Sequence, residues 1–119
     1  MQNLALVIED DLDLSEIFSK ALQTAGFQVE TIRDGRAAQK RLEEIVPNLV
    51  VLDLHLPYVS GSTLLDQIHT NKALDRTQVI ITTADNVQAE IYQNQATIVM
   101  VKPISFSQLR DISARLKTT

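Results

Sequence analysis

Short runs of apolar residues alternate along the chain with longer segments in which apolar residues recur every three or four positions. Continuous runs of valine, isoleucine and leucine are typical of strands buried on both faces of a parallel sheet. The recurring positions predict helices with one apolar face. The predicted strands are Leu4–Ile8, Phe27–Ile32, Leu49–Asp53, Val79–Thr82 with Thr83 at its end, and Ile98–Val101.

The predicted helices lie between these strands and after the last one. The segment 86–94 has few apolar positions and many Gln and Asn residues, which predicts a short or irregular fourth helix. Pro47 is expected to close the second helix. The apolar positions of the other four run from Leu14 to Ala25, from Ala37 to Val46, from about Ser62 to Asn71 and from Phe106 to Leu116.

Boundary residues support these assignments. Asp13 and Glu16 resemble a capping box at the start of the first helix, and Gly26 is expected to end that helix. Asp34–Gly35 is typical of a turn. Ser105 is expected to cap the last helix.

Strands and helices therefore alternate strictly, which predicts an α/β fold. Such alternation is typical of a doubly wound parallel sheet with helices on both faces and right-handed crossovers. For five strands the order 2-1-3-4-5 is the natural choice, and it leaves a crevice between strands 1 and 3 at their carboxyl ends. We expect residues 1–119 to form one domain, without a DNA-binding or enzymatic output segment.

Composition narrows the function classes. The 119 residues are 45% hydrophobic and 22% charged, as in a globular domain. The net charge of -4 argues against nucleic-acid binding, which requires a basic surface. The absence of cysteine excludes disulfides and thiolate metal sites. The N-terminus resembles neither a signal peptide nor a membrane span, so a cytoplasmic location is expected by default.

Polar groups follow four of the five predicted strands, and the fold would bring them to one edge of the sheet. Two or three carboxylates in one crevice repel each other by about 4 kcal/mol per pair at ~4 Å, so such a cluster holds a proton or a cation. An all-oxygen site suits a hard divalent ion such as Mg²⁺. These groups are Glu9, Asp10 and Asp11 after strand 1, Asp53 at strand 3, Thr83 at strand 4 and Lys102 at strand 5.

Together with a metal ion, these side chains would suit a phosphoryl group. Lys102 and the metal would balance the charge on the phosphoryl oxygens, and Thr83 would donate a hydrogen bond. The Asp53 carboxylate would be the nucleophile and would form an aspartyl phosphate. The residues alone do not choose among Glu9, Asp10 and Asp11.

The chain resembles the receiver domain of bacterial two-component response regulators over essentially all of its length. The resemblance rests on the acid pair Glu9–Asp10, the pattern from Val51 to Gly61, Thr83–Ala84 thirty residues after Asp53, and Lys102–Pro103. Each motif is weak alone, but their order on successive strand ends is specific.

The resemblance implies that Asp53 is the phosphoacceptor. It also implies Mg²⁺ held by Asp10 and Asp53, with Glu9 nearby or acting through water, and by the main-chain carbonyl of His55. The His55 side chain is expected to be an exposed loop residue.

The resemblance further implies that Thr83 and Lys102 contact the phosphoryl group. The donor would be a phosphohistidine on a sensor histidine kinase or a phosphotransfer protein. The only chemistry expected is self-phosphorylation and autodephosphorylation. A downstream protein would bind the face of strands 4 and 5, and phosphorylation-linked homodimers are common in the family.

The chain departs from the family pattern near that face. Val99 stands where receivers commonly carry an aromatic residue, three positions before Lys102. The segment between Thr83 and Lys102 is about three residues short, and Gln95–Ala96–Thr97 replaces the usual Ala-Gly pair. The phosphorylation site is therefore expected to be intact, while its readout is in question.

Two other functions remain open. The altered segment leaves room for a protein-interaction module of the same fold that no longer depends on phosphorylation. A small phosphatase of the haloacid dehalogenase type would need a second aspartate two residues after the nucleophile, where this chain has His55. Taken singly, Asp53 could be a turn residue, Thr83 a strand-end threonine and Lys102 a solvated lysine.

Overall fold

Five parallel strands form the centre of the protein in the computed structural model, which describes residues 3–117. Their order across the sheet is β2-β1-β3-β4-β5, as the alternation of elements predicts. Every strand agrees with its predicted range to within one residue. The strands are β1 (Asn3–Ile8), β2 (Phe27–Ile32), β3 (Leu49–Asp53), β4 (Gln78–Thr83) and β5 (Ile98–Val101).

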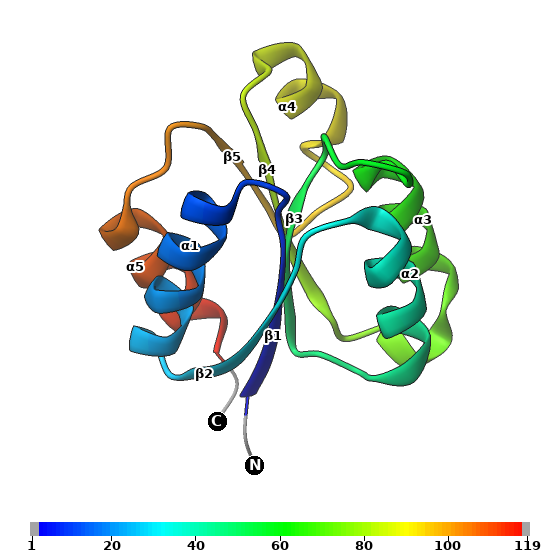
Figure 1. The fold of residues 1–119 in the computed structure, drawn as a ribbon, viewed down its shortest axis with the longest axis horizontal. Helices are drawn as coiled ribbons and strands as arrows, with labels where there is room; N and C mark the ends of the chain where they lie inside the picture. The colour runs from blue at the N-terminus through cyan, green and yellow to red at the C-terminus, as the bar shows by residue number, and fades with distance from the viewer. Residues whose placement is uncertain (1–2, 118–119) are drawn as a thin grey trace.

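Helices cover both faces of the sheet (Figure 1). Helices α1 (Leu12–Thr24) and α5 (Phe106–Leu116) lie on one face, and α2 (Gly35–Glu44) and α3 (Gly61–Thr70) lie on the other. A short 3₁₀ helix, η1 (Lys72–Leu74), precedes β4, and α4 (Asn86–Tyr92) lies between β4 and β5. None of the described helices is long and apolar enough to cross a membrane.

Alternate strand residues divide between two cores. The first core lies between the sheet and helices α1 and α5, and the second lies between the sheet and helices α2 and α3. Helices α1 and α5 contribute Phe18 and Leu109 to the first core, and helices α2 and α3 contribute Leu42 and Leu64 to the second. The first core takes Ala5, Val7, Leu49, Val51, Ile80 and Met100 from the strands; the second takes Leu6, Ile8, Val50, Leu52, Val79 and Ile81.

The start of α1 differs from the prediction. The N-cap is Asp11, whose side chain accepts a hydrogen bond from the Leu14 N–H at 2.9 Å. The capping box of Asp13 and Glu16 is therefore wrong, because the helix begins at Leu12 and Asp13 already lies in its first turn. Gly26 follows the helix with φ +107°, in agreement with its expected role.

Two predicted features around α2 also differ. Asp34 is not a turn residue but the N-cap of α2, accepting the Ala37 N–H at 2.8 Å. The helix ends at Glu44 rather than at Pro47, and the following residue already has an extended backbone. The short fourth helix is confirmed, since α4 has seven residues and buries none of them. The last helix has a full capping box at Ser105.

Candidate functional site

The carboxyl ends of four strands meet at one edge of the sheet, and they carry the predicted functional groups. Glu9 follows β1, Asp53 and Thr83 are the last residues of β3 and β4, and Lys102 follows β5. Glu9, Asp53 and Thr83 are buried, with exposures of 1%, 3% and 0%. The fold thus gathers on one edge side chains that are far apart in sequence.

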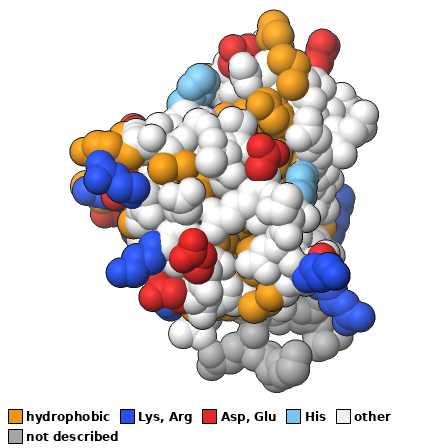
Figure 2. Space-filling view, turned by 90° about the vertical axis from the view of Figure 1, so that its right-hand side faces the viewer, with side chains coloured by type: hydrophobic (Ala, Val, Ile, Leu, Met, Phe, Trp, Pro, Cys, Tyr) orange, Lys and Arg blue, Asp and Glu red, His pale blue; other side chains and the backbone are white. Residues whose placement is uncertain are grey.

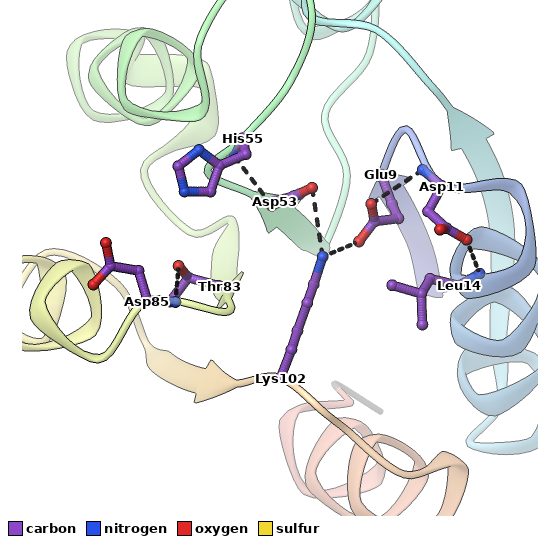
Figure 3. Close-up of polar contacts among 8 residues, drawn as sticks. All are labelled: Glu9, Asp11, Leu14, Asp53, His55, Thr83, Asp85 and Lys102. Atoms are coloured by element: carbon purple, nitrogen blue, oxygen red, sulfur yellow. Dashed lines mark hydrogen bonds and ion pairs between the residues drawn. The ribbon is translucent and has the colours of Figure 1, made fainter.

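Lys102 lies between the two buried carboxylates (Figure 3). Its Nζ donates to Glu9 Oε1 at 2.7 Å and lies 3.5 Å from Asp53 Oδ2. The shorter contact makes Glu9 the main partner of the ammonium in this state. Lys102 itself is held in place by its main-chain N–H, which donates to the Thr83 carbonyl at 2.7 Å.

Burial and charge act against each other at Glu9. Removal from water raises the pKa of Glu9 to about 7, an effect that the Lys102 hydrogen bond opposes and the charge of Asp53 reinforces. Burial also acts on Lys102, but its bonds to the two carboxylates leave its pKa raised overall. One ammonium therefore pairs with two carboxylates, and the cluster has an excess of negative charge.

Asp10 extends this cluster towards solvent. One carboxylate oxygen from each of Glu9, Asp10 and Asp53 lies within 4.8 Å of the others, and Asp10 alone of the three is exposed. Three carboxylate oxygens with no histidine or cysteine among them form a donor set that suits a hard divalent cation. The residues present therefore fit the Mg²⁺ ion that the sequence predicts.

Asp11 and His55 flank the cluster, and the main-chain N–H of each donates a hydrogen bond to one of its carboxylates. Asp11 caps α1, and its N–H also donates to Glu9 Oε2 at 3.2 Å. The His55 N–H donates to Asp53 Oδ1 at 3.1 Å, while its side chain is exposed, as predicted. The choice among the three acids is therefore resolved by position: Glu9 and Asp10 join the cluster and Asp11 does not. The role of the His55 carbonyl towards a metal stays a prediction.

Thr83 points away from Asp53 and towards α4 (Figure 3). Its Oγ1 accepts the Asp85 N–H at 3.1 Å, and Asp85 in turn caps α4 by accepting the N–H groups of Val87 and Gln88. Thr83 is thus near the site in the fold, yet within residues 3–117 no hydrogen bond joins its hydroxyl to Asp53. Its hydroxyl connects the strand end to the start of α4.

Gly61 is a structural residue of the site that the motif alone did not explain. Its N–H donates to the Leu54 carbonyl at 3.1 Å. A Cβ at this position would overlap the Asp53 carbonyl oxygen and the Leu54 Cα. Only glycine allows α3 to begin this close to the end of β3, which explains the glycine eight residues after Asp53.

Comparison with known proteins identifies the family. Residues 5–114 match the sequence model described as "Response regulator receiver domain". The phosphate regulon transcriptional regulatory protein PhoB of Rhizobium meliloti is 36% identical over 106 residues, which are 87% of this chain and 47% of that protein. The probable methanogenesis regulatory protein FilR2 of Methanothrix harundinacea is 31% identical over 125 residues, covering 96% of this chain and 81% of that protein.

Solved structures agree with the fold. The response regulator TrrA of Thermotoga maritima, in complex with Mg²⁺-BeF, aligns with a TM-score of 0.84 and 25% identity over 98% of this chain and 100% of that chain. The chemotaxis response regulator CheY4 of Vibrio cholerae aligns with a TM-score of 0.87 over 98% of this chain and 100% of that one, and at 22% identity it shows the fold alone.

The chain spans about half the length of several of these relatives, including PhoB and the regulator RpaA of Synechocystis, of which it covers 49%. The family match itself extends over nearly the whole chain, from β1 into α5. The relatives and the solved structures are response regulators and CheY-like receiver domains. This chain belongs to the response regulator receiver domain family of two-component signal transduction.

Proposed function

We propose that this receiver accepts a phosphoryl group on Asp53 from a phosphohistidine of a sensor histidine kinase or a phosphotransfer protein. The observation that carries this proposal is the position of Asp53. It is a buried carboxylate at a strand end, within 3.5 Å of the Lys102 ammonium and beside Glu9 and Asp10. We also propose that residues 1–119 contain the whole receiver unit, since they include every element from β1 to α5.

In the transfer step the Asp53 carboxylate is the nucleophile. It attacks phosphorus, the P–N bond of the phosphohistidine breaks, and its electron pair returns to the imidazole. His55 N–H holds Oδ1, so Oδ2, which faces Lys102, is the oxygen that takes the phosphoryl group. The Lys102 ammonium, which contacts Glu9 before the transfer, would then move to the negatively charged phosphoryl oxygens.

Asp10 and Asp53, with Glu9 directly or through water, are the residues that would hold Mg²⁺. When bound, the ion would offset negative charge on the transferred phosphoryl group. The TrrA structure, which is a complex with Mg²⁺-BeF, supports this assignment. Catalysis by the chain itself is limited to its own phosphorylation and slow dephosphorylation, so it acts as a switch and not as an enzyme on other substrates.

The switch that we propose runs through Thr83. A phosphoryl group on Asp53 adds charge close to -2 and strong acceptor oxygens, which would draw the Thr83 hydroxyl away from Asp85. This change would loosen the start of α4, where Val87 and Ile91 are exposed. Figure 2 shows hydrophobic side chains at the upper end of the molecule, where Figure 1 places α4. We propose this surface, together with Val101 of β5, as the binding face for a downstream protein.

A mass measurement tests the phosphoacceptor. The native chain incubated with Mg²⁺ and acetyl phosphate should gain the mass of one phosphoryl group, and Asp53→Asn should gain none. Asp11→Asn is a matched control, because it removes a carboxylate that caps α1 outside the cluster. Absence of any mass gain in the native chain would refute the proposal.

The alternative is a receiver-like module that binds its partner regardless of phosphorylation. It is favoured by one observation: α4 has no fully buried residue and packs on the second core through the partly buried Tyr92, so few contacts hold it in a single arrangement. Partner affinity measured for native, phosphorylated and Asp53→Asn forms separates the two functions. Equal affinities of all three forms would establish the alternative.

A further inference from the structure

Thr82 carries a buried hydroxyl without a partner. The residue is 0% exposed, and its Oγ1 has no hydrogen bond to any group of residues 3–117. A buried hydroxyl that makes no hydrogen bond destabilises the folded state. The unpartnered hydroxyl therefore lowers the stability of the fold, and the residues next to Thr82 in the sheet indicate what it could bind.

The register of the sheet places Thr82 next to Asp53. Asp53 of β3 pairs with Thr82 of β4, and Thr82 pairs with Met100 of β5. Paired residues on adjacent parallel strands lie about 4.8 Å apart and point to the same face. Asp53 follows Val51 by two residues and Thr82 follows Ile80 by two, and both of those residues point into the first core. Thr83 points to the opposite face.

The side chain of Lys102 passes over this position. Lys102 follows β5, yet its Nζ reaches Asp53 on β3 and Glu9 beyond β1. Since β4 lies between β5 and β3, the lysine stem has to cross the end of β4 on the face where Thr82 points. The Thr82 side chain thus lies on the same face of the sheet as the Asp53 carboxylate, at the strand end that the lysine stem crosses.

The hydrogen-bond acceptor that we assign to the Thr82 hydroxyl is Asp53 Oδ2. Oδ1 already accepts the His55 N–H, whereas the contact of Oδ2 with Lys102 is long, at 3.5 Å. We propose that Thr82 is a catalytic residue of dephosphorylation, whose hydroxyl donates a hydrogen bond to Asp53 Oδ2 once Lys102 has moved to the phosphoryl group. This inference rests on the function proposed above.

A hydrogen bond to that oxygen affects the lifetime of the phosphorylated state. In hydrolysis, water attacks phosphorus, the P–Oδ2 bond breaks, and its electron pair returns to the Asp53 carboxylate. The phosphoryl group leaves as dihydrogen phosphate, which releases a proton at neutral pH. Negative charge grows on Oδ2 as the bond breaks, so a donor at Oδ2 stabilises the transition state more than the ground state. Thr82 therefore shortens the lifetime of the aspartyl phosphate.

Thr82→Val tests this role, because it replaces the hydroxyl with a methyl group of similar shape. The rate constant for loss of the phosphoryl group, followed by mass spectrometry after removal of acetyl phosphate, should fall about three- to tenfold. Thr82→Ser keeps the hydroxyl and should restore a rate within about twofold of native. Thr82→Ala also removes the hydroxyl, with a smaller side chain, and the rate constant should fall as it does for Thr82→Val. In the unphosphorylated form Thr82→Val should raise Tm by roughly 3–8 °C, since it removes an unpartnered polar group.

Ser113 offers the matched control. Its hydroxyl on α5 is also 0% exposed and without a partner among the described residues, but it lies away from the strand ends. Ser113→Ala should raise Tm without changing the rate of dephosphorylation. If Thr82→Val raises Tm and its phosphoryl group is lost at the native rate, the inference is overturned while the proposed function stands. If the native chain takes up no phosphoryl group, both are overturned.

Discussion

Glu9→Gln perturbs the electrostatics of the site without changing its shape. Glu9 is 1% exposed, and burial raises its pKa from 4.5 to about 7. Each unit of pKa difference between folded and unfolded chains corresponds to about 1.4 kcal/mol. The ionised Glu9 therefore costs the metal-free fold at most about 3 kcal/mol, even with the Lys102 ammonium beside it.

The sign of the pH dependence follows from the two protonation states. Between pH 4.5 and about 7 the folded chain keeps a proton on Glu9 that the unfolded chain has released. Stability from this group is therefore greatest at acidic pH, falls by up to about 1.4 kcal/mol per pH unit through that window, and levels off above about pH 7. Glutamine does not titrate, so the variant lacks this component.

Urea denaturation in EDTA, followed by far-UV circular dichroism at pH 5 to 8, measures the effect. The difference in unfolding free energy between Glu9→Gln and native protein should grow by about 2 kcal/mol in favour of the variant as pH rises from 5 to 8. Glu43→Gln, on an exposed position of α2, should run parallel to the native protein. Parallel curves for Glu9→Gln and native protein would refute the raised pKa.

Mg²⁺ should reverse the trend in the native protein. A metal requires Glu9 in its ionised form, so binding competes with the proton. The stabilisation by a fixed Mg²⁺ concentration should increase as pH rises through about 7, and Glu9→Gln should weaken that increase. A stabilisation by Mg²⁺ that is independent of pH would place Glu9 outside the metal site.

Five further substitutions test three other parts of the structure. Lys102→Met removes the cation that two buried carboxylates share, and urea denaturation at pH 7.5 should register a loss of about 2–3 kcal/mol; an unchanged midpoint would contradict the ion pairing. Gly61→Ala should cost at least about 3 kcal/mol because the added Cβ overlaps backbone, whereas Gly26→Ala should cost only about 1–2 kcal/mol from its positive φ. Equal costs for the two would refute the close approach. Val87→Ser and Ile91→Ser should each shift Tm by less than about 2 °C because α4 buries none of its residues, and a larger shift would reveal packing.

The sequence predicted the fold well for a physical reason. Each strand of a doubly wound sheet is buried on both faces, so it appears as a continuous apolar run, and its carboxyl end has to meet the others at one edge. Glu9, Asp53, Thr83 and Lys102 could therefore be grouped before any contact was known. The capping of α1 was missed because Asp11 and Asp13 are chemically alike, and only the backbone at the helix start distinguishes them.

Contacts across the sheet were harder to predict than positions along it. Periodicity marks Thr82 as a strand interior, but only the register with Asp53 reveals that its hydroxyl faces the site. The preference of Lys102 for Glu9 over Asp53 likewise depends on the length of the lysine stem and on which carboxylate is more deeply enclosed. These features arise from pairs of residues on different strands, and no local pattern records them.

The absence of an aromatic residue at Val99 does not by itself prevent a conformational response. The start of α4 is held by one bond from the Asp85 N–H to Thr83 and by the Asp85 cap, each worth about 1 kcal/mol. Coupling between two sites typically amounts to about 1–3 kcal/mol, which is the scale of these contacts. Val99 packs against the second core as a partly buried residue and has no ring to rotate. We therefore expect the response to be a change in the order of α4, driven by the Thr83 hydroxyl, rather than the movement of a side chain on β5.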